Sequence, residues 1–185
     1  LIEPMTKELR DGRRLRIWSA GCSSGQEPYS IALCILSVLP DARAYDARIL
    51  ATDINPLVLE TGRRATYPAE EAASLPADLR RSWMESTGTG TLRFYEAPRG
   101  LITFRQLNLI GSWPMKGPFD AVFCRNVVIY FDEKTQMRLL NRMLPLIRPG
   151  GYLYLGHSER VIGPAETLFK IDGTTVYRKI GGSLA

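Results

Sequence analysis

The sequence predicts an α/β fold of the doubly wound type, in which a mostly parallel sheet ends in an antiparallel hairpin and carries a small inserted β-subdomain. Two strand-and-helix units follow one another near the N-terminus, and that alternation is typical of a parallel sheet. A later strand, in the first half of 119–131, is apolar throughout, as strands covered on both faces are. At 185 residues, the chain is long enough for one domain with a small appendage.

The first unit consists of a strand, a glycine-containing loop and a helix. The run RLRIWSA at 14–20 is rich in β-forming residues, and the apolar run at 28–39 predicts a helix buried against a sheet. Pro28 suits the first helical turn, where its missing N–H costs nothing, and Pro40 ends the helix. The loop GCSSGQEP therefore follows the carboxyl end of the first strand.

The second unit repeats this order. The run ARILATD at 47–53 predicts a strand that ends in a carboxylate, and Asn55 with Pro56 opens a helix over 56–65. Two such units in succession imply parallel strands.

Residues 66–113 interrupt the alternation and predict a small inserted subdomain of helix and β-hairpin. An acidic helix start is followed by a cationic amphipathic piece at 77–86 and a Gly/Thr-rich turn. Two β-rich runs, 91–97 and 101–109, then flank Pro98-Arg99-Gly100. A turn-type spacer between such runs predicts a hairpin.

The alternation resumes after the insertion. Asp132 starts a helix over 132–147 whose apolar residues have helical spacing, and 151–157 is the next strand. The end of the chain, 168–180, predicts a hairpin around Asp172-Gly173, which gives the sheet its antiparallel end.

Composition excludes several classes of function. The longest apolar stretch, at 30–39, is well short of the roughly 18 residues that a membrane span needs. Three cysteines without C-x-x-C spacing and one histidine, His157, argue against a disulfide framework and against metal sites, so no metal is expected and a reducing compartment is favoured. The net charge of +5 suits an acidic partner.

Two glycines and a carboxylate stand where doubly wound sheets bind ligands, at the carboxyl ends of strands. Gly21 and Gly25 follow the first strand, but their G-x-x-x-G spacing departs from the G-x-G-x-x-G of dinucleotide sites. Asp53 ends the second strand, where a carboxylate accepts both hydrogens of a ribose diol. The alternatives are that the glycines serve only the turn and that Asp53 only caps the helix near Pro56.

Glu27 discriminates between cofactors. It stands at the N-terminus of the first helix, where a dinucleotide would place its pyrophosphate, and two anions there repel each other. A cationic ligand with a ribose, such as S-adenosylmethionine with its sulfonium and ammonium groups, would be attracted instead. The alternative is that Glu27 only complements the helix dipole.

Four parts of the chain together resemble one protein family. They are IWSAGCSSGQEPYSIAL, LATDINPLVLETGRRATY, FRQLNL, and FDAVFCRNVVIYFD with RPGGYLYLGHSE, in that order across nearly all of the chain. On these strings the chain resembles the C-terminal S-adenosylmethionine-binding domain of the CheR family of chemotaxis receptor methyltransferases. The resemblance implies a Rossmann-like methyltransferase fold and an enzyme that forms methyl esters on glutamate side chains of chemoreceptor cytoplasmic domains, releasing S-adenosylhomocysteine.

The resemblance also implies roles for single residues. Glu27 would meet the methionine amino end of the cofactor, Asp53 the ribose, and Asn108 with Leu109 the adenine. Tyr130 would lie beside the transferred methyl group, and Arg125 with Asn126 would form the pocket floor. The predicted cofactor-binding residues are Gly21, Gly25, Glu27, Asp53, Asn108, Leu109, Arg125 and Asn126, and the predicted catalytic residues are Tyr130 and Arg125.

The residue types allow functional and structural interpretations. Asn108 at a strand end can hydrogen-bond an adenine edge while Leu109 covers its face, or it can cap the strand. Arg125 and Asn126 favour a ligand or a partner, because such residues are rarely buried without one. Tyr130 either orients a substrate carboxylate or lies in the aromatic core.

Family members also carry parts that this chain does not match. Their N-terminal helical domain, and a linker with a T-x-F-F-R element that contacts cofactor and substrate, have no counterpart here. We therefore expect an excised domain with weak or no activity of its own. The 66–113 insertion corresponds to the small β-subdomain with which some relatives bind a receptor tail peptide, but it is short, so we expect no such binding.

Two other functions stay open on the sequence. The domain could be a non-catalytic cofactor-binding or scaffold module of a larger signalling protein. It could instead methylate nucleic acid, but no N-P-P-Y-like string is present and two valines follow Asn126, so no nucleic-acid partner is expected. We expect a cytoplasmic protein that inserts into no membrane and whose partner is the chemoreceptor helix bundle.

Overall fold

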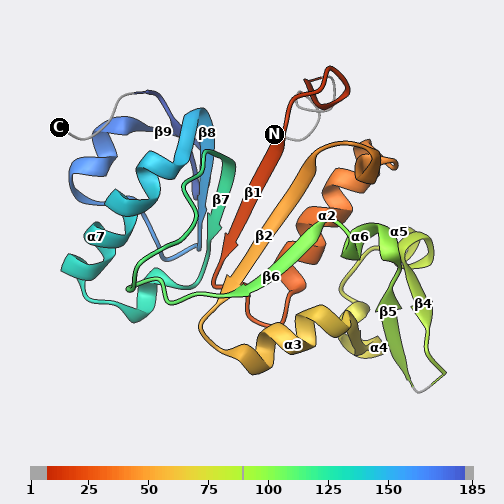
Figure 1. The fold of residues 1–185 in the computed structure, drawn as a ribbon. Helices are drawn as coiled ribbons and strands as arrows, with labels where there is room; N and C mark the ends of the chain where they lie inside the picture. The colour runs from red at the N-terminus through yellow and green to blue at the C-terminus, as the bar shows by residue number, and fades with distance from the viewer. Residues whose placement is uncertain (1–7, 89, 182–185) are drawn as a thin grey trace. The chain divides into compact units, whose positions relative to one another are not determined.

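The computed structural model describes residues 8–88 and 90–181. Its contacts divide the chain into two units: unit 1 holds Leu1–Leu15 and Cys22–Gln106, and unit 2 holds Arg16–Gly21 and Leu107–Ala185. Both units contain parallel strands with helices around them, so the predicted α/β class with a mostly parallel sheet is confirmed (Figure 1). Within the described ranges, no helix combines the length and the apolar character that crossing a bilayer requires.

Unit 1 contains one parallel strand pair covered by helices. Strand β2 (Ala47–Asp53) has the predicted bounds and pairs with β6 (Ile102–Gln106), in register from Ile49 opposite Ile102 to Asp53 opposite Gln106. Helices α2 (Gln26–Val38) and α3 (Pro56–Arg64) pack on these strands (Figure 1). The helix α3 begins where expected because the Asn55 side chain accepts a hydrogen bond from the Leu57 amide at 2.9 Å.

The insertion of unit 1 is a separate antiparallel sheet. Its central strand β5 (Thr91–Phe94) pairs on one side with β3 (Thr66–Pro68) and on the other with β4 (Met84–Ser86). Two short helices, α4 (Ala69–Ala72) and α5 (Ala77–Trp83), connect β3 to β4.

The hairpin predicted from 91–97 and 101–109 is wrong. A short helix, α6 (Glu96–Arg99), occupies the expected turn, and the second run pairs with β2 rather than with β5. The physical reason is burial, because Leu101 and Phe104 are almost inaccessible to solvent and Phe104 packs with Tyr29 and Leu59 in the core of the unit.

Unit 2 arranges five strands in the order β1-β7-β8-β10-β9. Strands β1 (Leu15–Ala20), β7 (Phe119–Cys124) and β8 (Ile147–Leu155) pair in parallel, and β7 is buried almost throughout, as predicted. The predicted terminal hairpin is confirmed, since β9 (Phe169–Gly173) and β10 (Val176–Lys179) pair antiparallel.

The helix of unit 2, α7 (Glu133–Met143), is shorter than the predicted 132–147. Its start is as expected, because Asp132 accepts a hydrogen bond from the Thr135 amide at 2.8 Å, which also lowers the pKa of that carboxyl. A 3-10 turn follows, and β8 begins at Ile147 opposite Phe119 of β7 rather than at 151. The helix therefore ends four residues early because the chain after it already belongs to the sheet.

Candidate functional site

Asp53 lies beside the loop that precedes α2. The Cys22 amide donates to the Thr52 carbonyl, and the Ser23 amide donates to Asp53 Oδ2 at 2.9 Å. The other carboxylate oxygen, Oδ1, accepts from the Asn55 amide at 3.0 Å. Because Asn55 itself caps α3, the interpretation of Asp53 as the helix cap is wrong. A carboxylate has about four acceptor positions, so two remain for the hydroxyls of a diol.

Gly25 is required by the conformation of this loop. It is the N-cap of α2 with φ +99°, in the left-handed region that favours glycine. A Cβ there would lie 2.9 Å from Tyr67 Oη and 3.1 Å from Gly62 Cα. The Tyr67 hydroxyl in turn donates to the Ser24 carbonyl at 2.7 Å. Tyr67 therefore fixes this glycine loop (residues 22–25), a role that the sequence did not reveal.

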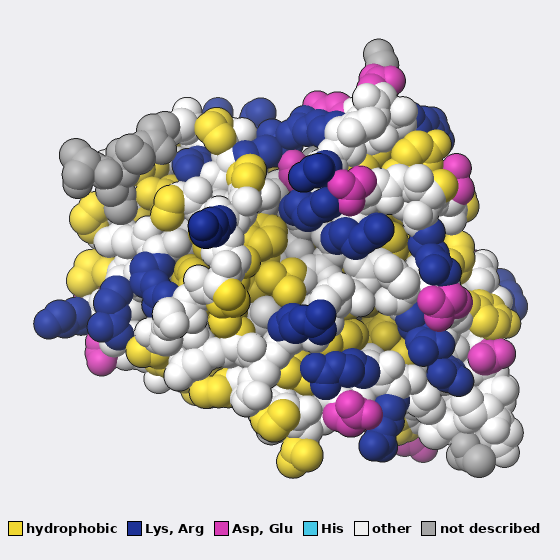
Figure 2. All heavy atoms as spheres, in the orientation of Figure 1, with side chains coloured by type: hydrophobic (Ala, Val, Ile, Leu, Met, Phe, Trp, Pro, Cys, Tyr) yellow, Lys and Arg dark blue, Asp and Glu magenta, His cyan; other side chains and the backbone are white. Residues whose placement is uncertain are grey.

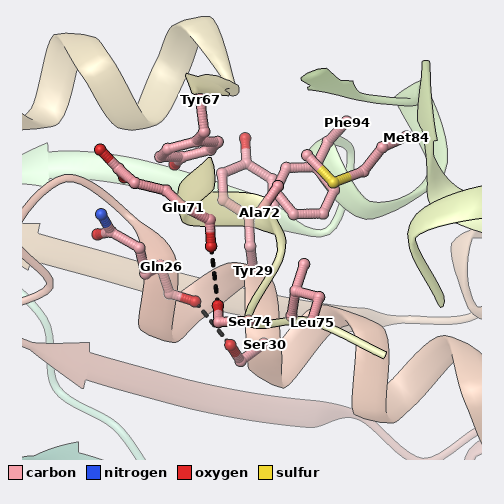
Figure 3. Close-up of a pocket in the computed structure, with 10 residues that line it drawn as sticks. All are labelled: Gln26, Tyr29, Ser30, Tyr67, Glu71, Ala72, Ser74, Leu75, Met84 and Phe94. Atoms are coloured by element: carbon pink, nitrogen blue, oxygen red, sulfur yellow. Dashed lines mark hydrogen bonds between the residues drawn. The ribbon is translucent and has the colours of Figure 1, made fainter. Parts of the chain in front are cut away.

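A small cavity lies behind the loop. It is lined by apolar side chains, among them Tyr29 and Phe94, whose rings stack with centroids 4.2 Å apart, and by Gln26 and Glu71 on its polar side (Figure 3). Its volume is about 70 Å³. Ligand pockets typically measure roughly 300–1,000 Å³, so this cavity is a gap in the packing and not the place of a nucleoside cofactor.

Two negatively charged side chains, those of Asp53 and Glu27, lie at the glycine loop of unit 1. Glu27 lies in the first turn of α2, where the sequence placed it, and is half-buried. Burial, followed by the negative charges of Asp53 and Glu27, raises the pKa of the Cys22 thiol to about 12. The negative charges of Asp53 and Glu27 favour a cation, so this loop suits a ligand that carries positive charge.

In unit 2, Gly21 packs against the segment after β7 (residues 125–130). Gly21 has φ +79°, and a Cβ on it would overlap Val127 Cγ2. Arg125 and Asn126 are exposed, and Asn126 takes a left-handed φ of +57°. Tyr130 is 79% exposed, so the interpretation of Tyr130 as an aromatic core residue is wrong.

Glu159 holds this segment, and sequence reasoning missed it. The residue is buried, and its Oε2 accepts from the amides of Gly156 at 2.6 Å and Asn126 at 2.9 Å. Its Oε1 accepts from the amides of Val127 at 2.8 Å and Ile129 at 3.3 Å. The place of Glu159 three positions after Gly156, which follows β8, accounts for its bond to the Gly156 amide but predicts none of its contacts with residues 126–129.

Asn108 and Leu109 lie beyond the strand that was predicted to end at them. Because β6 ends at Gln106, Asn108 belongs to a turn, in which its side-chain oxygen accepts from the Ile110 amide at 2.9 Å. Asn108 is exposed and Leu109 is buried. His157 is exposed.

The predicted site residues divide between the units. Unit 1 carries Gly25, Glu27 and Asp53, and unit 2 carries Gly21, Asn108, Leu109, Arg125, Asn126 and Tyr130. Unit 1 brings Asp53 against the glycine loop, and unit 2 brings Gly21 against the segment after β7.

Comparison with known proteins gives consistent matches. Residues 1–178 match the family model described as CheR methyltransferase, SAM binding domain. The chain is 45% identical over 181 residues to a probable chemotaxis protein methyltransferase of Rhizobium etli, covering 96% of this chain and 68% of that protein. It is 44% identical over 183 residues to chemotaxis protein methyltransferase 2 of Pseudomonas aeruginosa, covering 96% and 64%. For the chemotaxis protein methyltransferase of Escherichia coli the values are 42% over 166 residues, 88% and 57%.

The chain spans 57–68% of the length of these three relatives. Among solved structures, a SAM-dependent methyltransferase from Methanosarcina mazei gives a TM-score of 0.46 at 19% identity, covering 82% of this chain and 56% of that one. A score below 0.5 adds nothing to the matches from sequence.

Proposed function

The chain belongs to the CheR methyltransferase family as its S-adenosylmethionine-binding domain, and on that premise we propose that it forms methyl esters on glutamate side chains of chemoreceptor cytoplasmic domains. Its cofactor is S-adenosylmethionine, and its relatives are chemotaxis protein methyltransferases. The names of those relatives support a chemoreceptor as the substrate.

The observation that carries the proposal is the pair of carboxylates at the glycine loop. Asp53, with acceptor positions left on both oxygens, is assigned to the ribose hydroxyls. Glu27, in the first turn of α2, is assigned to the ammonium group of the methionine end. These two side chains match the two kinds of donor that the cofactor presents, a neutral diol and a cation.

The chemistry asks little of the side chains. S-adenosylmethionine supplies the methyl group when it is bound. A glutamate carboxylate has a reference pKa of about 4.3, so it is ionised at neutral pH and needs no general base to become a nucleophile. The chain therefore has to align the reacting groups and exclude water, and such alignment can contribute roughly 7–11 kcal/mol in well-oriented systems.

We assign that alignment to the segment after β7. The hydroxyl of Tyr130, on a side chain 79% exposed, can donate a hydrogen bond that orients the substrate carboxylate. Arg125 and Asn126, also exposed, are assigned to the floor of the cofactor pocket, and Asn108 with Leu109 to the adenine. These roles remain those that the family resemblance implies.

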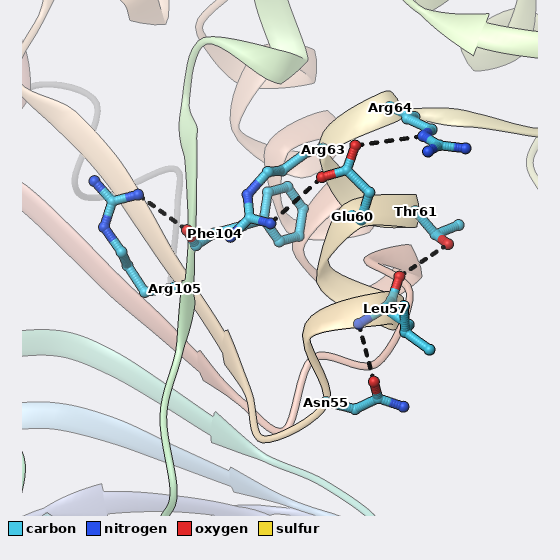
Figure 4. Close-up of polar contacts among 8 residues, drawn as sticks. All are labelled: Asn55, Leu57, Glu60, Thr61, Arg63, Arg64, Phe104 and Arg105. Atoms are coloured by element: carbon cyan, nitrogen blue, oxygen red, sulfur yellow. Dashed lines mark hydrogen bonds and ion pairs between the residues drawn. The ribbon is translucent and has the colours of Figure 1, made fainter.

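The charge of the chain supports an acidic partner. Lys and Arg side chains are spread more widely than Asp and Glu over the face drawn in Figure 2, and the net charge is +5. Two of these arginines, Arg63 of α3 and Arg105 of β6, both donate to the Phe104 carbonyl, at 3.3 and 3.1 Å (Figure 4). Arg63 also pairs with Glu60 at 3.6 Å. A positive surface speeds encounter with a glutamate-rich receptor at low salt. A receptor cytoplasmic domain as substrate places the reaction in the cytoplasm.

The test is a methyl-transfer assay with methyl-labelled cofactor and a chemoreceptor cytoplasmic domain. Glutamate methyl esters release labelled methanol in alkali, so label that is stable to alkali would contradict the proposed product. A receptor with its accepting glutamates replaced by glutamine is the matched control and should take up no label.

The assay should compare this chain with a longer polypeptide that adds the region upstream. We expect the longer polypeptide to transfer the methyl group, and this chain to bind cofactor but transfer slowly, because nothing in it matches the linker of the family. Full activity in this chain would show that Arg125, Asn126 and Tyr130 suffice. Cofactor binding without transfer in either polypeptide would favour the non-catalytic module.

A further inference from the structure

The segment after β7 has an irregular backbone conformation that must be stabilised by contacts with its surroundings. β7 ends at Cys124, Asn126 takes a left-handed φ of +57°, and a 3-10 turn follows at Val128–Tyr130. A left-handed conformation is uncommon outside glycine, and such a residue persists only where its surroundings determine it. Asn126 tolerates this conformation better than most residues, but tolerance does not select it.

The Glu159 carboxylate is the group that selects this conformation. Three amides of the segment, those of Asn126, Val127 and Ile129, donate to it at 2.8–3.3 Å, and the Gly156 amide adds a fourth bond at 2.6 Å. A carboxylate has about four acceptor positions, so these amides saturate it. Hydrogen bonds to a charged acceptor are roughly twice as strong as neutral ones. Glu159 is only 6% exposed, so its bonds serve the backbone and not a ligand.

Two glycines confine the segment on either side. A Cβ on Gly156 would lie 2.6 Å from Asn126 Oδ1 and 2.7 Å from Glu159 Oε2, and a Cβ on Gly21 would overlap Val127 Cγ2. The backbone of the segment therefore lies closely packed between the ends of β8 and β1.

The outer side of the same segment is exposed. Ile129 is 48% and Tyr130 is 79% exposed, although both are large and largely apolar. A contact with substrate needs exposed side chains on a fixed backbone, because a displacement of about 1 Å can lower a rate about 100-fold.

We propose that Glu159 is a positioning residue for methyl transfer, which holds residues 126–129 and thereby Tyr130 in the reactive arrangement. The proposal rests on the methyltransferase function proposed above and extends it to a buried residue with no substrate contact. Glu159 acts through the backbone amides, so its loss should lower kcat without lowering cofactor affinity to the same degree.

The test is Glu159→Gln in the longest active polypeptide that carries this chain. The substitution replaces one acceptor oxygen by an NH2 group, so two of the four amides face a donor. We expect faster hydrogen exchange at the amides of residues 126–129 and a kcat about 10- to 100-fold lower. The dissociation constant of S-adenosylhomocysteine and the KM for the cofactor should rise by a smaller factor than kcat falls, since the substitution disturbs Asn126 but leaves the assigned cofactor contacts of Asp53 and Glu27 untouched.

Glu166→Gln is the matched control. Glu166 is an exposed carboxylate of the same unit that accepts one backbone amide, that of Gly163 at 3.0 Å, and its loss should leave kcat and the exchange of residues 126–129 unchanged. Glu159→Asp keeps the charge and both oxygens, so it should recover part of the lost kcat. If Glu159→Gln does not fold, Glu159→Asp is measured in its place.

The outcomes separate the two proposals. If the wild-type polypeptide transfers methyl groups and Glu159→Gln has the same kcat, the proposed role of Glu159 is overturned and the proposed function stands. A loss of kcat that only matches the loss of folded protein and of cofactor binding would also overturn that role. Absence of transfer in the wild-type polypeptide, with cofactor bound, would refute the proposed function and this proposal with it.

Discussion

Replacement of Gly21 by alanine tests how tightly the end of β1 packs on the segment after β7. Gly21 has φ +79°, and an added Cβ would overlap Val127 Cγ2. Gly88, in the turn between β4 and β5, has the same φ of +79°, but nothing lies within 4 Å of an added Cβ. The two glycines therefore share the backbone strain and differ in the steric overlap.

The magnitudes follow from these two contributions. A left-handed conformation costs an L-residue roughly 1–2 kcal/mol. An inserted methyl group in a packed site adds roughly 1–3 kcal/mol. We expect Gly88→Ala to lower the free energy of unfolding by about 1–2 kcal/mol and Gly21→Ala to lower it by about 2–5 kcal/mol.

Urea unfolding of both variants, extrapolated to water, measures the difference. Equal losses of stability would mean that Val127 moves aside without cost, and the tight packing inferred for this segment would be refuted. Since Val127 also donates to Glu159, the hydrogen exchange of its amide should rise in Gly21→Ala and stay unchanged in Gly88→Ala.

Three other predictions concern the glycine loop of unit 1. Asp53→Ala should weaken S-adenosylhomocysteine binding, measured by calorimetry, about 10- to 150-fold through loss of charge-assisted bonds. The control Asn55→Ala should lower the free energy of unfolding by about 1 kcal/mol, because a helix cap is lost, and leave the affinity unchanged. Unchanged affinity in Asp53→Ala would remove Asp53 from the site. Glu27→Gln should weaken binding of S-adenosylhomocysteine but not of adenosine, and equal losses for both ligands would mean that Glu27 only supports the fold. The pKa of Cys22 is raised from 9.0 to about 12, so between those pH values the unfolded chain releases a proton that the native chain keeps, and stability falls as pH rises. Cys22→Ala should make that fall shallower by up to about 1.4 kcal/mol per pH unit in urea unfolding at pH 9–11, and a slope equal to wild type would contradict the burial of the thiol.

Local signals predicted most elements of the fold. The β2 strand has the expected bounds, Asp132 and Asn55 cap the helices that they were expected to precede, and the terminal hairpin forms around Gly173. The pairing of β6 could not be read in this way. Its run lies next to β5 in sequence, yet it pairs with β2, roughly fifty positions earlier, and that choice depends on which core buries Phe104.

The site shows the same limit. The types and positions of Gly21, Gly25 and Asp53 pointed to strand ends because chain order alone places them there. The roles of Tyr67 and Glu159 depend on a carbonyl or amides more than 25 residues away, and no local pattern encodes those contacts. A tyrosine in a short strand and an acid in a turn have many more common roles.

The most direct test of the account is a crystal structure of this chain with S-adenosylhomocysteine. We predict that the ribose hydroxyls lie about 2.6–3.0 Å from the Asp53 carboxylate, which keeps its bonds from the Ser23 and Asn55 amides, and that the amino group of the ligand lies beside Glu27. A ligand whose ribose is bound elsewhere, with the Asp53 carboxylate contacted only by those two amides, would contradict the account.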